Sequence, residues 1–190
     1  MEETIVENIC TFYVSFSFHC FKRKVLHRDL KCQNVFLTAS NICKLGDFGI
    51  ARVLSKTFEK AKTMVGTPYY LSPEIINGIP YSFKSDVWSL GVILYEMCTL
   101  KPPFAGDNLR NLALNIVKGE YQPIPRNYSS DLKRLVVNLL TSRPEQRYSV
   151  KEILALPYIR NRIKTFLSET INRNEFSHTI LHNQVNDKNY

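Results

Sequence analysis

The chain has 190 residues, enough for one domain with a buried core. Hydrophobic residues make up 44% and charged residues 22%, values typical of a folded globular protein rather than a fibrous or disordered chain. The net charge is +8, but the Lys and Arg residues are scattered apart from the short cluster Lys22-Arg23-Lys24. This distribution favours a solvated basic surface over a site for nucleic acid or anionic lipid.

The cysteines are spread along the chain and form no C-x-x-C pair: Cys10, Cys20, Cys32, Cys43 and Cys98. Their odd number and wide spacing predict reduced thiols rather than a disulfide framework or a zinc site. We therefore expect a reducing compartment, the cytosol or the nucleus.

The N-terminal apolar run at residues 9–21 is 13 residues long, shorter than the ~20 residues that a membrane-spanning helix needs. The segment before it, Met1-Glu2-Glu3-Thr4, is acidic where a secretory signal carries positive charge. We expect neither a membrane span nor a signal peptide. Within the run, residues 11–19 point alternately to two faces, one of which is aromatic and β-branched. This period of two predicts a β-strand.

The middle of the chain predicts two short strands at residues 35–37 and 42–45, joined by residues 38–41. Residues 47–74 follow without clear periodicity. Segments of that length in a compact domain are usually functional or disordered.

The second half of the chain is predicted to be helical. Residues 85–97 are apolar nearly all round, as expected for a buried central helix. Further helical patterns cover residues 108–118, 130–141 and 149–155, and the helix at 130–141 is capped by Ser129, Ser130 or Asp131. After about Thr170 the chain becomes polar, which predicts a disordered tail.

Three motifs stand in order along the chain. His27-Arg28-Asp29 is followed by Asn34 to give H-R-D-x-x-x-x-N, Asp47-Phe48-Gly49 comes next, and Ser72-Pro73-Glu74 occupies the place of A-P-E. Residues 25–162 thereby resemble the C-terminal lobe of a eukaryotic serine/threonine protein kinase. The residues within Lys31–Asn34 and Lys62–Gly66 are most similar to the NIMA-related (never-in-mitosis) kinases.

The resemblance implies a mainly α fold, a kinase C-lobe in which a helical bundle carries short β-strands around the catalytic loop. We predict an atypical N-terminal segment at 1–22, the kinase C-lobe at 23–162 and a polar, partly disordered tail at 163–190. The family would place a long buried helix before the catalytic loop, where the alternation at residues 11–19 predicts a strand.

The resemblance also assigns roles in phosphoryl transfer, which needs positioning and cations more than covalent chemistry. Asp29 would accept or orient the proton of the substrate hydroxyl, and Lys31 would place a positive charge at the γ-phosphate. Asn34 and Asp47 would hold the magnesium of Mg-ATP, because oxygen ligands suit this hard cation. Thr67 would hydrogen-bond Asp29 and Lys31, a pairing that marks serine/threonine specificity.

Other residues are implied to be structural. Phe48 would pack against the helical core beside Gly49 of the same motif. Glu74 and Arg147 would form a buried ion pair that holds the activation segment. Asp86 would accept backbone N–H bonds from the catalytic loop.

The resemblance places the activation phosphate at Thr63, with Thr57 as the weaker candidate. A phosphate there would bring about two negative charges, which Arg28 and Arg52 could pair with. We expect phosphorylation of Thr63 to order residues 50–66.

The sequence departs from the family in one respect. It has seven glycines, none of them in a G-x-G-x-x-G motif, and the first, Gly46, already follows the catalytic loop. We expect the N-terminal lobe that covers ATP to be missing and residues 1–22 to be unrelated sequence, so that the isolated chain is an impaired or inactive kinase. The alternatives are a catalytically dead C-lobe that binds substrates or partners through the surface around residues 100–128, and a truncated product without function.

The expected partners are protein substrates with serine or threonine, and by the same reasoning full-length kinase or its regulators. Nucleic acid and membrane are not expected. The location implied by the resemblance is the cytoplasm or nucleus, with the cytoskeleton and centrosome as family sites.

Overall fold

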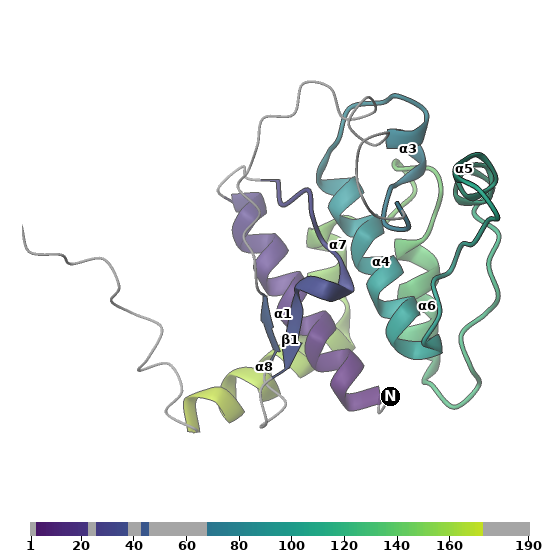
Figure 1. Ribbon diagram of the computed structural model, residues 1–190. Helices are drawn as coiled ribbons and strands as arrows, with labels where there is room; N and C mark the ends of the chain where they lie inside the picture. The colour runs from purple at the N-terminus through teal and green to yellow at the C-terminus, as the bar shows by residue number, and fades with distance from the viewer. Residues whose placement is uncertain (1–2, 23–25, 38–42, 46–67, 173–190) are drawn as a thin grey trace, which may run out of the picture.

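The computed structural model describes residues 3–22, 26–37, 43–45 and 68–172, which form a mainly helical bundle (Figure 1). The helices are α1 (Glu3–Lys22), α3 (Pro73–Ile76), α4 (Phe83–Thr99), α5 (Leu109–Lys118), α6 (Ser130–Leu139), α7 (Val150–Ala155) and α8 (Pro157–Asn172). The strands β1 (Val35–Leu37) and β2 (Cys43–Leu45) pair antiparallel, with Val35 opposite Leu45. The mainly α kinase-like C-lobe predicted from the sequence is confirmed.

Helix α4 is the central element, and it packs between α1 and α6 (Figure 1). Its side chains are buried almost all round, as the apolar sequence at 85–97 predicted. The helix starts with a capping box in which Ser82 accepts the N–H of Lys84 and Ser85 accepts the N–H of Ser82. It ends at Thr99 and is followed by the C-cap residue Leu100, whose φ of 59° lies in the left-handed region.

The prediction of a β-strand at residues 11–19 is wrong, because this segment is part of the helix α1. The buried hydrophobic residues described in α1 follow helical rather than alternating spacing: Val6, Ile9, Cys10, Tyr13 and Val14. They pack against α4, α7 and α8. Strand preference amounts to about 1 kcal/mol at most per residue, so burial of this stripe overrides it.

The predicted helices and strands of the later segments are confirmed to within a few residues. Ser129 is the cap of α6 and accepts the N–H of Leu132. Ser149 and Glu152 form a capping box at α7.

Besides α1, two further helices differ from the predicted pattern: α3 and α8 were not predicted. Helix α8 continues to Asn172, so the first part of the predicted polar tail is helical, and residues 173–190 lie outside the described residues. Arg162 of α8 donates to the carbonyl oxygen of Thr4 and pairs with Glu7, which fastens α8 to α1. None of the described helices is both long and apolar enough to cross a membrane.

Candidate active site

Three side chains predicted to serve catalysis and metal binding lie together in the loop after α1. Nζ of Lys31 lies 2.9 Å from Oδ2 of Asp29 and forms an ion pair with it. Nδ2 of Asn34 donates to the carbonyl oxygen of Asp29 at 3.1 Å and to Oδ2 at 3.4 Å. Asn34 is buried, whereas Asp29 and Lys31 remain partly exposed. The cluster thus presents the Asp29 carboxylate and the Lys31 ammonium group to solvent, with the buried Asn34 amide beneath them.

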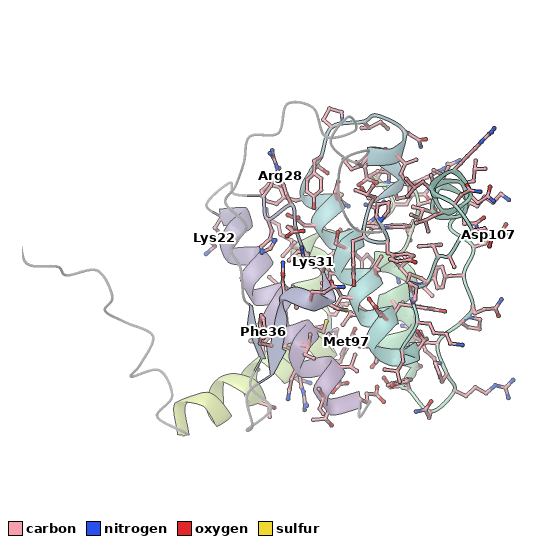
Figure 2. All side chains as sticks on the ribbon, in the orientation of Figure 1. Lys22, Arg28, Lys31, Phe36, Met97 and Asp107 are labelled. Carbon is pink, nitrogen blue, oxygen red and sulfur yellow. The ribbon has the colours of Figure 1, made fainter. Side chains whose placement is uncertain are left out.

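A short 3-10 turn at Cys32–Asn34 explains why residues five apart in the sequence meet. The N–H of Asn34 donates to the carbonyl oxygen of Lys31 at 3.1 Å, which folds the chain back after one turn. Figure 2 shows Arg28, Lys31 and Phe36 following one another along the segment after α1.

Asp86 of α4 holds the start of this loop. Its Oδ2 accepts the backbone N–H of His27 at 3.2 Å and its Oδ1 accepts that of Arg28 at 3.1 Å. Arg28 has a φ of 67°, a conformation uncommon for a residue other than glycine. Such a conformation costs about 1–3 kcal/mol and persists only where its surroundings hold it. Bonds from two consecutive N–H groups to one buried carboxylate provide that restraint.

Burial sets the protonation of the groups beneath the loop. It raises the pKa of the Asp86 carboxyl above its ordinary value, although the bonds from Tyr81, Arg28 and His27 act in the opposite direction. Burial also lowers the pKa of His27. The His27 imidazole is therefore neutral near pH 7, which lets its Nδ1 accept the N–H of Asp29 at 3.4 Å.

A second network connects the same loop to α4 through Tyr70. The N–H of Cys32 donates to the Tyr70 hydroxyl at 3.3 Å, and this hydroxyl donates to Oε2 of Glu96 at 2.6 Å. The Ser89 hydroxyl donates to the carbonyl oxygen of Tyr70 at 3.1 Å. No sequence pattern predicted Tyr70 or Glu96 as site residues, and the one signal was the position of Tyr70 just before the Ser72-Pro73-Glu74 motif.

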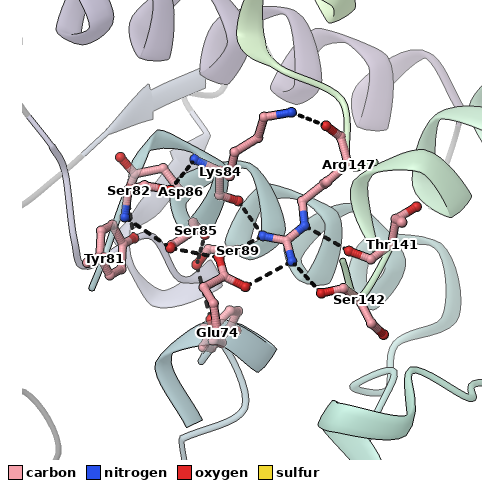
Figure 3. Close-up of polar contacts among 11 residues, drawn as sticks. Glu74, Tyr81, Ser82, Lys84, Ser85, Asp86, Ser89, Thr141, Ser142 and Arg147 are labelled. Atoms are coloured by element: carbon pink, nitrogen blue, oxygen red, sulfur yellow. Dashed lines mark hydrogen bonds and ion pairs between the residues drawn. The ribbon is translucent and has the colours of Figure 1, made fainter. Parts of the chain in front are cut away.

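Glu74 and Arg147 form an ion pair in which both residues are buried (Figure 3). Nη1 of Arg147 lies 2.8 Å from Oε1 of Glu74, and Nη2 lies 3.0 Å from Oε2. The other three guanidinium N–H groups donate to the carbonyl oxygens of Lys84, Thr141 and Ser142. All five donors of the guanidinium are therefore used. The bonds from Arg147 lower the pKa of Glu74 despite the opposing effect of burial.

The remaining predicted site residues lie outside the described residues: Asp47, Phe48, Gly49, Arg52, Thr63 and Thr67. Their roles stay predictions. The exposed side chain of Arg28 is described, but its predicted pairing with a phosphate on Thr63 is likewise untested.

A model of the protein kinase domain matches residues 1–159 of this chain. The chain therefore belongs to the protein kinase family.

Within that family, it is similar to serine/threonine protein kinases named Nek. Mouse (Mus musculus) Nek1 is 51% identical over 158 residues, which cover 83% of this chain and 13% of Nek1. Human (Homo sapiens) Nek5 is 48% identical over 164 residues, covering 86% of this chain and 23% of Nek5. A probable serine/threonine-protein kinase nek3 from Dictyostelium discoideum is 53% identical over 141 residues, 72% of this chain and 13% of that protein. The chain thus spans less than a quarter of these relatives, and the predicted resemblance to NIMA-related kinases is confirmed.

Proposed function

We propose that this chain forms the part of a serine/threonine protein kinase site that positions the substrate hydroxyl and the metal-bound nucleotide. The observation that carries the proposal is the cluster of Asp29, Lys31 and Asn34, which follows directly on two residues whose backbone N–H groups donate to Asp86 of α4. Positioned charges of this kind are what phosphoryl transfer requires of a protein.

Asp29 would orient the substrate hydroxyl and accept its proton. Lys31 and Asn34 both donate to Oδ2 of Asp29, so we assign the other oxygen, Oδ1, to the substrate. Lys31 would add positive charge where negative charge develops on the transferred phosphoryl group. Thr67 would steady Asp29 and Lys31 from the activation segment.

The residues present fit a magnesium-bound nucleotide. The two bonds from Nδ2 of Asn34 fix the amide orientation, so its oxygen faces away from Asp29. A carboxylate from Asp47 would complete the oxygen ligands that Mg²⁺ prefers. When bound, the ion of Mg-ATP would offset the charge of the phosphates.

We further propose that Thr63 is the activating phosphorylation site and that Arg28 and Arg52 would pair with its phosphate. The partly buried Arg28 backbone is already fixed by Asp86, which would hold one of the two cations in place. Equal protease sensitivity of residues 50–66 with and without the phosphate would count against this assignment.

For this chain by itself we expect slow phosphoryl transfer, because its 190 residues contain no G-x-G-x-x-G motif to cover the phosphates. Its substrates would be proteins with serine or threonine, and full-length kinase or kinase regulators would be further partners. The cytoplasm or nucleus, including the cytoskeleton and centrosome, is the location in keeping with the family.

The test is a thermal melt of the 190-residue chain with and without Mg-ATP. We expect Mg-ATP to raise the midpoint, because a ligand that binds only the folded state stabilises it. Asp47→Asn should abolish the shift. Asp107→Asn is the matched control, since Asp107 is an exposed aspartate at the edge of the molecule, away from Lys31 (Figure 2). A cooperative melt that Mg-ATP does not move would refute nucleotide binding by this chain.

One observation favours a second candidate, a partner-binding module at the surface around residues 100–128. Helix α5 leaves Leu109 and Leu114 more than half exposed. This function would be supported if the chain binds a protein substrate of a Nek kinase, and if that binding persists in Asp47→Asn but is lost in Leu114→Ser. Loss of binding in both variants would count against it.

A further inference from the structure

The loop before α4 contributes a tyrosine to the base of the catalytic loop. The hydroxyl of Tyr81 donates to Oδ1 of Asp86 at 2.5 Å (Figure 3). This is the same oxygen that accepts the backbone N–H of Arg28. The phenol thus contacts the carboxylate on which the strained turn at Arg28 depends.

Tyr81 supplies a third donor to the Asp86 carboxylate. Asp86 is 5% exposed, so water contributes little to its solvation. The backbone N–H groups of His27 and Arg28 supply one bond to each oxygen. A hydrogen bond from a hydroxyl to a carboxylate is short and strong compared with a neutral one. The Tyr81 bond therefore fixes the carboxylate plane in the orientation in which both oxygens face the loop.

We infer that Tyr81 is a positioning residue for the catalytic loop, acting through Asp86 to hold His27 and Arg28 and hence the neighbouring Asp29. The inference rests on the proposed function only in treating Asp29 as the residue that meets the substrate. Tyr81 itself touches Asp86 rather than any reacting group.

A purely structural role of Tyr81 gives a different expectation. If the ring only packs the loop at residues 77–82, then removal of the hydroxyl alone leaves the catalytic loop unchanged. If the hydroxyl acts through Asp86, the change Tyr81→Phe loosens two particular backbone amides 53 and 54 positions away along the chain.

The test is amide hydrogen exchange of the 190-residue chain, measured residue by residue by NMR. In Tyr81→Phe we expect exchange at His27 and Arg28 to rise about tenfold, the effect of weakening a hydrogen bond to a charged group. Exchange in α6 should change little. The control is Tyr158→Phe, because the Tyr158 hydroxyl is buried with no hydrogen-bond partner among the described residues.

A second measurement tests the route through Asp86. The carboxyl of Asp86 faces Tyr81, His27 and the N–H of Arg28, and the Tyr81 bond lowers its pKa. A carbon-13 titration of Tyr81→Phe should therefore show the Asp86 pKa moved upward, whereas Tyr158→Phe should not move it. In an Asp86→Asn background, Tyr81→Phe should add nothing to the exchange of His27 and Arg28. If the Asp86→Asn chain does not fold, the titration decides.

The inference is overturned if Tyr81→Phe leaves the two amides unchanged, or speeds exchange equally in the loop and in α6. It is also overturned if the Asp86 titration does not move. None of these measurements uses ATP or substrate. A chain that binds no Mg-ATP but shows the local exchange pattern would therefore refute the proposed function and support the role of Tyr81.

Discussion

Replacement of Arg147 by methionine is the sharpest test of what holds this fold together. Arg147 is 1% exposed and Glu74 is 3% exposed, so the pair is shielded from water. Methionine fills most of the same volume but removes the charge and all five donors. Three main-chain carbonyl oxygens, those of Lys84, Thr141 and Ser142, lose a donor together with the carboxylate.

Removal of one partner from a buried ion pair costs about 3–5 kcal/mol, because the other charge is left uncompensated. Arg147 also lies over the ring of Trp88, with Cζ 4.9 Å from the ring centroid, which adds to the loss. For a chain of this size each kcal/mol lowers the melting midpoint by roughly 2–4 °C. We therefore expect the midpoint of Arg147→Met to fall by at least about 6 °C.

The assay is urea unfolding followed by circular dichroism, with thermal melts beside it. Arg143→Met is the matched control, because Arg143 is an exposed arginine four positions away and should change stability by less than about 0.5 kcal/mol. The double variant Glu74→Met with Arg147→Met should recover much of the loss, since it removes both buried charges. A cost below about 1 kcal/mol for Arg147→Met would show that the pair is solvated in solution and refute the reasoning.

Three further predictions concern packing, strain and pH. Gly91→Ala should lower the free energy of unfolding by about 1–2 kcal/mol in urea melts, because the added Cβ would lie 2.8 Å from Cβ of Leu139 and push α4 away from α6. An unchanged midpoint would mean that the helices can separate freely. Leu100→Gly should raise the thermal midpoint by about 2–4 °C, because it relieves a left-handed φ at a side chain that is 75% exposed; a fall would contradict this account. The pKa of Glu74 is lowered in the folded chain, so its contribution is present above the unfolded value near 4.5 and is lost as pH falls through the folded value. Wild type should therefore lose stability in acid more steeply than Glu74→Gln, and parallel curves of unfolding free energy against pH would exclude this linkage.

The features that depend on residues close together in the chain could be predicted before the structure was known. The cluster of Asp29, Lys31 and Asn34 lies within residues 29–34, and one 3-10 turn is enough to bring its members together. The central helix was predictable because an apolar segment of that length can be buried on all sides. The cap at Ser129 was predictable because capping is a bond between residues three positions apart.

The features that depend on residues far apart in the chain could not be predicted, because they arise from packing between elements. The alternation at residues 11–19 predicted a strand, but α1 gains more by burying its helical stripe against α4, α7 and α8 than strand preference can supply. The bonds of Asp86 to Tyr81 and of Tyr70 to Glu96 join side chains that no local pattern links, and they appear only when the loops fold onto α4. The motif thus marks the candidate catalytic residues, whereas the packing of the bundle determines which side chains hold them in position.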